Sequence, residues 1–289
     1  MNILITGATG FLGSHVIKRL IKKHDLTILN RTTSSLSRIS SFVDKLSIYN
    51  INNIKKIFVD KNIETIIHLS TNYGRKNETV KEIVNTNVLF PTDLIEVAIE
   101  NGLKNFINTD TSARIDNSFY ASSKKAFLNI LYCFHKKNKI NIMNFQPEYI
   151  YGPGDDSTKF IPFAIENILC NKAVNATNGD QKRDFIFIDD LVDAYELAID
   201  LNPKLKWNSI NFEVGTGKSI SLRSFFNKVE EITGKKGYIQ WGTLPYRDDD
   251  MFDSKADIKN INKVLNWTPT HSIEDGLNKT IDWYKRKIR

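Results

Sequence analysis

The chain opens with the stretch that most limits its fold: an apolar run, three regularly spaced glycines and an apolar helical pattern. A strand is predicted over residues 2–6, and a helix over residues 11–23 follows Gly7, Gly10 and Gly13. In such a turn the first glycine permits the sharp bend, the second admits a pyrophosphate, and the third lets helix pack on strand. N–H groups and the helix dipole favour anions there. The stretch predicts a dinucleotide-binding turn, although the spacing alone also fits an ordinary strand-to-helix turn.

Strands and helices alternate as far as about residue 150, which predicts a parallel, doubly wound sheet and an α/β Rossmann fold. The fully apolar strand at 65–69 is expected at the sheet centre, and a break or bend is predicted near Pro91. We expect a nucleotide-binding domain over residues 1–150 and a smaller substrate lobe over 151–289, interwoven with it. Further strands are predicted at 26–29, 45–50, 104–108 and 140–145, and helices at 54–61, 78–101, 119–137, 160–171, 189–200, 220–233 and 272–286.

The end of the second predicted strand indicates which dinucleotide binds. A site for NAD usually places an acidic residue there to bond the ribose 2′-hydroxyl, whereas arginine beside small hydroxyl residues suits a 2′-phosphate. Here Asn30 is followed by Arg31 and Thr32, with no acid. We therefore predict NADP(H) in preference to NAD(H). The alternative is that Arg31 is a surface residue of a polar loop.

The segment Tyr120-Ala121-Ser122-Ser123-Lys124 carries the predicted chemistry. Positions i and i+4 of a helix share a face, so Tyr120 and Lys124 point the same way. A lysine cation close to a phenol lowers the tyrosine pKa toward neutrality, which makes a usable general acid or base. Thr111, after the neighbouring strand, can hydrogen-bond the same carbonyl oxygen. The alternative is an amphipathic helix with a surface lysine and a half-buried tyrosine.

Composition excludes several other classes of protein. The net charge is +7, but the lysines are scattered in pairs without a basic block, so no nucleic-acid partner is expected. Cys133 and Cys170 lack disulfide or metal-type spacing; we expect no metal, a reducing compartment, and core or subsurface positions for both cysteines. Because a strand is predicted from residue 2, no signal peptide is expected. No apolar run reaches the ~18 residues of a membrane span, so a cytoplasmic protein is expected.

Several motifs together resemble a known family in order and spacing. They are Gly7-Ala8-Thr9-Gly10-Phe11-Leu12-Gly13, His68-Leu69-Ser70, Asn87-Val88, Tyr120-Ala121-Ser122-Ser123-Lys124, Tyr151-Gly152-Pro153-Gly154-Asp155, Arg183-Asp184-Phe185-Ile186 and Leu265-Asn266-Trp267-Thr268-Pro269. The chain resembles, essentially end to end, the extended short-chain dehydrogenases/reductases of the nucleotide-sugar epimerase/dehydratase/reductase type. The resemblance implies an NAD(P)-binding lobe, a lobe for a nucleoside-diphosphate sugar, and a homodimer built on a helix pair that includes the Tyr120 helix.

The resemblance also implies roles for single residues around the cofactor. Tyr120 would be the acid/base, and Lys124 would bond the nicotinamide ribose and tune Tyr120. Thr111 would replace the usual serine or threonine, with Thr109 as the fallback. Asn50 and Ile51 stand where relatives often have an acidic residue and an aliphatic residue beside adenine. The full set expected to bind cofactor is Gly7, Thr9, Gly10, Phe11, Leu12, Gly13, Asn30, Arg31, Thr32, Asn50, Ile51, Leu69, Ser70, Thr71, Thr109, Tyr120, Lys124 and Pro147.

For the substrate, the resemblance implies a second set of residues. Arg183 and Arg247 match positions that commonly hold the diphosphate, an anion that suits bidentate arginine. The alternative for Arg183 is a structural ion pair with Asp184 or Asp189. Thr71 belongs to the loop expected to face the sugar, and either Glu148 or Tyr149 is expected to face nicotinamide or sugar. The residues expected to bind substrate are Tyr73, Arg75, Thr111, Tyr149, Arg183 and Arg247.

Two departures from the family pattern guide the choice of reaction. Only eight residues separate Thr111 from Tyr120, whereas relatives have a longer loop beside the sugar, so an open or rebuilt pocket is expected. Asp110-Thr111-Ser112 lacks the glutamate of the Thr-Asp-Glu set of sugar 4,6-dehydratases, which disfavours dehydration.

The chain is most similar to CDP-abequose and CDP-paratose synthase-type 4-ketoreductases. That similarity implies NADPH-dependent reduction of the C4 keto group of a CDP- or dTDP-linked 4-keto-deoxyhexose. The product would be a deoxysugar for a surface polysaccharide such as lipopolysaccharide. Two alternatives stay open: a nucleotide-sugar 4-epimerase that retains NAD, and a non-catalytic NADP-sensing protein. Proteins of the latter kind typically lose the tyrosine–lysine pair, which is present here.

Overall fold

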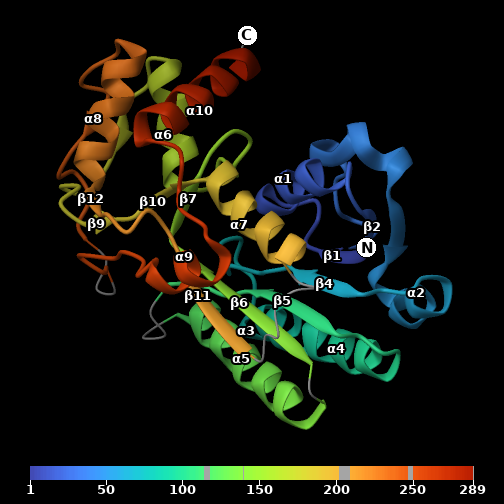
Figure 1. Ribbon diagram of the computed structural model, residues 1–289. Coiled ribbons are helices and arrows are strands. Elements are labelled where there is room, and N and C mark those ends of the chain that lie inside the picture. The colour runs from blue at the N-terminus through green and yellow to red at the C-terminus, as the bar shows by residue number, and fades with distance from the viewer. Residues whose placement is uncertain (114–117, 139, 202–208, 247–249, 289) are drawn as a thin grey trace. The chain divides into compact units, whose positions relative to one another are not determined.

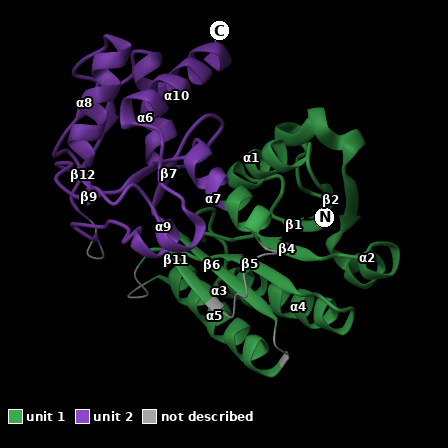
Figure 2. Cartoon of the chain, in the orientation of Figure 1, with its two compact units in different colours: residues 1–146, 195–212 green, residues 147–194, 213–289 purple. Residues whose placement is uncertain are grey.

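The computed structural model describes residues 1–113, 118–138, 140–201, 209–246 and 250–288. The chain forms two compact units, which Figure 2 shows in different colours. Unit 1 comprises residues 1–146 and 195–212, and unit 2 comprises residues 147–194 and 213–289. The sequence predicts one boundary, at residue 150. In the structure the chain passes into unit 2 after residue 146, returns to unit 1 for residues 195–212, and then enters unit 2 again.

Unit 1 is built on a sheet whose strands run in the order β11-β6-β5-β4-β1-β2-β3. The strands from β1 to β6 pair in parallel. The chain winds outward in both directions from β1 and β4, and sheets of this kind bind ligands beyond the carboxyl ends of the strands at that reversal. The α/β doubly wound prediction is therefore confirmed. The strands are β1 (Asn2–Thr6), β2 (Asp25–Asn30), β3 (Ser47–Asn50), β4 (Thr65–His68), β5 (Asn105–Thr109), β6 (Asn141–Pro147) and β11 (Ser209–Val214).

Helices cover both faces of this sheet, with α1 on one face and α4 and α5 on the other (Figure 1). On the α4–α5 side the core is apolar, and Leu94, Ile95 and Phe127 are fully buried in it. The break predicted near Pro91 is a π-helical segment over residues 85–89, which ends two residues before the proline. Pro91 itself occupies the first turn of α4, where its missing N–H costs nothing. The helical elements are α1 (Phe11–Leu20), η1 (Ser37–Lys45), η2 (Ile51–Asn53), α2 (Ile54–Asp60), α3 (Val80–Val84), η3 (Asn85–Leu89), α4 (Phe90–Glu100) and α5 (Phe119–Asn138).

The described residues of unit 2 form helices and the two-stranded sheets β10-β7, β12-β9 and β13-β8. Aromatic rings form much of its core: the Phe185 and Phe225 centroids lie 4.2 Å apart and those of Tyr151 and Phe225 5.3 Å apart. Helix α7 begins in unit 2 and ends in unit 1. The elements are β7 (Tyr149–Tyr151), α6 (Phe160–Leu169), β8 (Val174–Asn175), β9 (Lys182–Arg183), β10 (Phe185–Phe187), α7 (Ile188–Leu201), β12 (Ile220–Ser221), α8 (Leu222–Thr233), β13 (Ile239–Gln240), α9 (Lys259–Leu265) and α10 (Ile273–Ile288).

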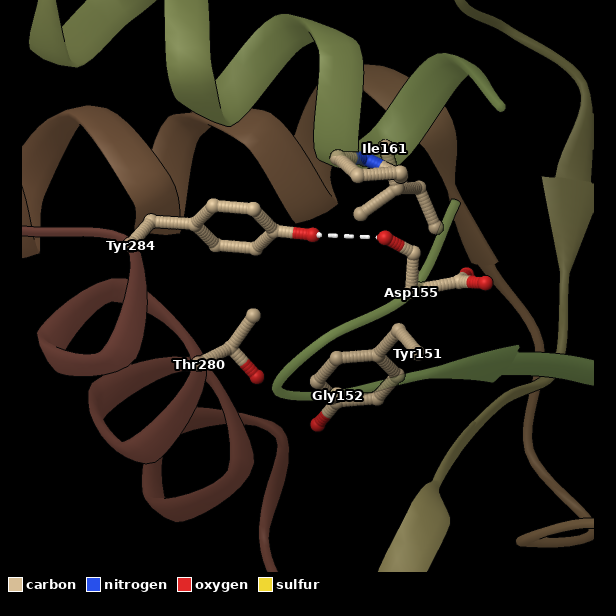
Figure 3. Close-up of a pocket in the computed structure, with 7 residues that line it drawn as sticks. Tyr151, Gly152, Asp155, Ile161, Thr280 and Tyr284 are labelled. Atoms are coloured by element: carbon tan, nitrogen blue, oxygen red, sulfur yellow. Dashed lines mark hydrogen bonds between the residues drawn. The ribbon is translucent and has the colours of Figure 1, made fainter. Parts of the chain in front are cut away.

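A junction inside unit 2 joins the segment after β7 to α6 and α10 (Figure 3). The Tyr284 hydroxyl donates to the Asp155 carbonyl at 3.3 Å, and Tyr151 and Thr280 line the same space. That space is too narrow for a water molecule. It is a packed joint between elements rather than a ligand pocket.

The exposure of both cysteines contradicts the prediction made from composition. Cys133 and Cys170 are exposed rather than core or subsurface residues. Cys133 lies in the C-terminal half of α5, close to the exposed Lys136, and Cys170 caps the end of α6. Both therefore lie where a helix meets solvent.

Candidate active site

The glycine turn has the geometry that a dinucleotide requires. Gly7 has a φ of +67°, and a Cβ there would lie 2.6 Å from the Leu69 carbonyl carbon and the Ser70 nitrogen. A Cβ on Gly13 would lie 2.2 Å from the Gly7 carbonyl oxygen. The exposed Gly10 caps α1, whose first turn carries no acidic residue. A helix N-terminus of this kind, with no acidic side chain in its first turn, suits a pyrophosphate.

Beneath this turn, a buried hydrogen-bond pair joins the ends of β1 and β4. The Thr6 hydroxyl accepts from the N–H groups of Leu69 and Ser70 at 3.2 and 3.3 Å and is hydrogen-bonded to His68 Nδ1, 2.8 Å away. Burial, with the Lys124 charge as a smaller cause, holds the pKa of His68 well below its ordinary value. A neutral His68 thus fixes the chain where it leaves the sheet for the predicted nicotinamide region.

At the other side of the reversal, the predicted adenosine residues follow β2 and β3. Asn30 and Asn50 are paired in register at the ends of these strands. Arg31 and Thr32 come directly after Asn30 and are exposed. The Asn50 side chain accepts from the Asn52 N–H at 2.9 Å, which leaves its amide group able to donate. An exposed arginine and a threonine at this edge offer donors to a phosphate.

The tyrosine, lysine and threonine predicted to carry the chemistry lie together in unit 1. Tyr120 and Lys124 project from the first turns of α5, and Thr111 follows β5. Thr111 and Tyr120 are hydrogen-bonded through their side chains. By contrast, the Thr109 hydroxyl is bonded to the Tyr195 hydroxyl at 2.6 Å. This geometry favours Thr111 over Thr109 as the partner of Tyr120.

The electrostatics of this group differ from the prediction. Burial raises the pKa of Tyr120 above its ordinary value, Tyr73 and Asp110 add to the effect, and the Thr111 hydrogen bond and Arg75 oppose it. Burial also lowers the pKa of Lys124 to about 8. The expected lowering of the Tyr120 pKa by Lys124 is thus wrong for this chain, because loss of hydration outweighs the charges nearby. At neutral pH Tyr120 is protonated and can donate.

The loop after β4 also contacts Tyr120, through the ring of Tyr73. The ring centroids of Tyr73 and Tyr120 lie 4.9 Å apart, and the Arg75 guanidinium carbon lies 4.9 Å from the Tyr73 centroid. The buried Asn87 amide holds this loop: Oδ1 accepts from the Asn72 N–H at 2.7 Å, and Nδ2 donates to the Asn72 carbonyl at 2.9 Å. Tyr73 and Arg75, predicted from the sequence to face a sugar, therefore do lie beside Tyr120.

Four residues to which the sequence patterns assigned no role support this group: Asn87, Ser123, Asp110 and Lys125. Asn87 Nδ2 also donates to Ser123 Oγ at 2.9 Å, which ties the loop to α5. Asp110 is fully buried between Thr111 and Lys125, with an ion pair to the latter. The available signals were weak: an asparagine inside a helical pattern, and an acid directly before Thr111.

The unit 2 residues predicted to bind the diphosphate are already bonded to protein. Arg183 donates to the Lys182 carbonyl at 2.8 Å, to the Met251 carbonyl, and to Asp250 Oδ1 at 3.2 Å. Among the described residues its ion-pair partner is Asp250 rather than Asp184 or Asp189, and binding of the diphosphate by Arg183 stays a prediction. Arg247 lies outside the described residues.

Asp184 instead holds a turn of its own unit. Its carboxylate accepts from the Thr216 N–H at 2.7 Å, the Gly217 N–H at 2.9 Å and the Ala256 N–H at 3.2 Å. A Cβ on Gly215 would lie 2.4 Å from this carboxylate. Asp184 is thus a scaffold residue.

The segment before Tyr151 contains the last predicted site residues. Pro147 is buried at the end of β6, and the Glu148 carboxylate accepts from the Ser254 hydroxyl at 2.7 Å. Tyr149 is 42% exposed, and the Arg183 guanidinium lies 5.1 Å from its ring centroid. Of the two neighbours, Tyr149 is the one that offers surface to a ligand.

Comparison with known proteins decides the family. A sequence model described as the NAD dependent epimerase/dehydratase family matches residues 3–211. The chain belongs to this family. Among curated members, it is 34% identical over 288 residues to the CDP-abequose synthase of Salmonella muenchen, covering 96% of each chain, and 30% identical to that of Salmonella typhimurium. The recognition made from the sequence motifs is confirmed.

Solved epimerase/dehydratase structures share the fold. UDP-glucose 4-epimerase of Thermotoga maritima with UDP-glucose superposes with a TM-score of 0.89 over 100% of both chains, at 24% identity. The dTDP-glucose 4,6-dehydratase DesIV of Streptomyces venezuelae, with NAD bound, gives a TM-score of 0.88 at 19% identity. At these identities the likeness shows the fold alone.

None of the helices in the described part of the chain combines the length and the hydropathy of a membrane span. Among the same residues, no three histidine, cysteine or acidic side chains are grouped as metal ligands.

Proposed function

We propose that this epimerase/dehydratase-family chain is an NADPH-dependent reductase of the C4 keto group of a nucleotide-linked 4-keto-deoxyhexose. The observation that carries the proposal is the Tyr120–Lys124–Thr111 group at the carboxyl edge of the sheet that bears the glycine turn. The end-to-end similarity to CDP-abequose synthases supports a deoxysugar product and favours CDP over dTDP as the carrier.

Reduction needs a hydride at carbon and a proton at oxygen. Reduced NADP, when bound at the glycine turn, supplies the hydride. The Tyr120 phenol donates its proton to the carbonyl oxygen as that oxygen gains negative charge, and the Thr111 hydroxyl donates a hydrogen bond to the same oxygen. Because burial raises the pKa of Tyr120, the protonated donor form predominates at neutral pH. This favours reduction over a reaction that starts by removing a proton from an alcohol.

Arg31 supports NADPH rather than NADH as the hydride source. It is exposed directly after β2, and the next acidic residue in the chain is Asp44. The guanidinium and the Thr32 hydroxyl would hold the 2′-phosphate, an anion that a carboxylate at this position would repel.

The family resemblance supports three further proposals about the working enzyme. It would act in the cytoplasm, in deoxysugar biosynthesis for a surface polysaccharide, and as a homodimer built on a helix pair that includes α5. Light scattering of the purified chain tests the last of these, since a monomer at micromolar concentration would contradict it.

A substrate panel tests the function. The purified protein is mixed with NADPH or NADH and with CDP-, dTDP-, UDP- or GDP-linked 4-keto-6-deoxyhexoses, and absorbance at 340 nm is followed. The proposal expects oxidation of NADPH with the CDP-linked substrate. Tyr132→Phe, which removes another hydroxyl from α5, serves as the matched control for Tyr120→Phe.

Two results would contradict the reductase. No oxidation with any sugar, together with tightly copurified NAD⁺, would favour the epimerase, in which the hydride returns to the opposite face. Cofactor binding without turnover of any nucleotide sugar would favour the NADP-sensing protein.

A further inference from the structure

A buried carboxylate lies next to the proposed catalytic group without belonging to it. Asp110 directly follows β5, and its side chain is 0% exposed. Its Oδ2 atom accepts from Gln146 Nε2 at 3.0 Å and from Asn144 Nδ2 at 3.5 Å, and forms an ion pair with Lys125. Its Oδ1 atom is buried without a hydrogen-bond partner among the described residues. A buried charge with an unsatisfied oxygen is costly, so stability alone does not explain this arrangement.

Lys125 connects this carboxylate to the backbone of Thr111. Its ammonium group bonds Asp110 Oδ2 and also donates to the Thr111 carbonyl at 3.0 Å. The Asp110 N–H donates to the Phe145 carbonyl at 2.7 Å, which anchors the other side of the same peptide segment to β6. One lysine therefore ties the end of β5 to α5, the helix that carries Tyr120.

Lys124 and Lys125 are consecutive, so they leave the helix in directions about 100° apart. Lys124 is 2% exposed, whereas the Lys125 side chain is 31% exposed and reaches Asp110. The two lysines thus have different tasks although they share a charge.

We propose that the Asp110–Lys125 ion pair is the positioning element of the Tyr120–Lys124–Thr111 site. It fixes the Thr111 backbone against α5 and places a negative charge beside Lys124. The link to turnover rests on the reductase function proposed above. The effect of the ion pair on the charge of Lys124 does not depend on that function, because it is a property of the protein without substrate.

The charges that act on Lys124 make this proposal specific. The Asp110 carboxylate raises the pKa of Lys124, whereas the Lys125 ammonium lowers it. His68 on β4 also faces Lys124, but burial holds the pKa of His68 well below its ordinary value, so it is neutral. Removing one half of the ion pair should therefore move the titration of Lys124 one way, and removing the other half should move it the opposite way.

The test is an NMR titration of the chain with lysine labelled at ¹³Cε, in Asp110→Asn, Lys125→Met and Lys125→Arg. The Lys124 signal is assigned by its loss in Lys124→Met. We expect a Lys124 midpoint near 8 in the parent chain, a downward shift of roughly half a pH unit or more in Asp110→Asn, and an upward shift in Lys125→Met. Lys125→Arg, which keeps the charge, should retain the parent midpoint.

An ion pair whose two charges do not act on Lys124 would not give opposite shifts. Shifts in the same direction, or no shift in either variant, would overturn the proposal. If Asp110→Asn fails to fold, thermal unfolding will reveal it. In that case the two Lys125 variants decide, because equal Lys124 midpoints in Lys125→Met and Lys125→Arg would overturn the proposal. No sugar is used, so failure of the reductase proposal appears separately, as absence of turnover by the parent chain.

Discussion

The two arginines predicted to bind phosphate, one in each unit, differ in their exposure to solvent and in their bonds to protein. In unit 1, Arg31 is exposed at the end of β2, where a ligand can reach it. In unit 2, Arg183 is 5% exposed and donates to Asp250 and to two backbone carbonyls. One arginine is available to a ligand as it stands, whereas the other would have to share or exchange its bonds. A family motif therefore marks a position without saying whether the side chain serves the ligand or the scaffold.

The largest effect should come from unit 1, because the proposed chemistry lies there. Tyr120→Phe removes the only proton that its side chain can donate, so turnover should fall by about 10² to 10⁴-fold. NADPH affinity, measured by quenching or enhancement of cofactor fluorescence, should change little. Tyr132→Phe should retain parent activity. Retained turnover in Tyr120→Phe would place the acid elsewhere and remove the contrast between the units.

The second prediction asks whether Arg183 is mainly scaffold. Arg183→Gln removes the ion pair with Asp250 and the guanidinium bonds to two backbone carbonyls, so the free energy of unfolding should fall by about 3 kcal/mol. The half-buried Arg223 provides the control, since it lies 4.8 Å from the Trp241 ring centroid and donates to the Asn178 carbonyl but has no ion pair among the described residues. Arg223→Gln should cost less, about 1 kcal/mol. Urea unfolding at neutral pH measures both. Equal small losses would mean that Arg183 is kept for a ligand, as Arg31 is.

The third prediction contrasts two neighbouring lysines within unit 1. The folded-state pKa of Lys124, about 8, lies below its ordinary 10.5, so the charged side chain opposes folding below pH 8. Lys124→Met should therefore raise the free energy of unfolding at pH 7 by on the order of 2 kcal/mol. That gain should shrink as the pH rises toward the ordinary value, where the unfolded chain also loses its proton.

Lys125→Met is the control for this prediction, because it leaves the buried Asp110 carboxylate unpaired. It should lose stability at pH 7. A loss in both variants would show that Lys124 is stabilising and that burial does not dominate its environment.

The smallest effect is expected at Arg31. Arg31→Asp should shift the ratio of kcat/KM values for NADPH and NADH toward NADH by about tenfold or more, since a carboxylate repels the 2′-phosphate. Arg286→Asp, at an exposed position near the end of α10, controls for the change in net charge. If the ratio of kcat/KM for NADPH and NADH is unchanged, Arg31 does not bind the 2′-phosphate. Arg31 would then no longer differ from Arg183 as a ligand-binding arginine.

Local patterns were enough to predict much of unit 1. The strand over residues 2–6, the glycine turn and the helix that carries Tyr120 follow from periodicity and spacing, and the structure has all three. In unit 2, periodicity likewise predicts the helix α6, which spans residues 160–169 and is predicted to end two residues later. These features depend on neighbours a few positions apart in the chain.

What could not be predicted depends on distant partners. Strand β11 joins the unit 1 sheet beside β6, more than sixty positions earlier in the chain. The Arg183 partner Asp250 is equally remote. The raised pKa of Tyr120 results from burial, which the Tyr-x-x-x-Lys spacing does not encode. Asp110 and Lys125 are visible in the sequence, but only the fold places them in contact.

The most direct test of the proposed reductase is the fate of a labelled hydride. The protein is incubated with NADPH carrying deuterium at C4 of the nicotinamide and with a CDP-linked 4-keto-6-deoxyhexose, and the product is examined by NMR. We predict loss of one NADPH per sugar and deuterium at C4 of the sugar. Recovery of the 4-keto sugar unchanged, with no loss of NADPH and no deuterium at C4, would contradict the reductase.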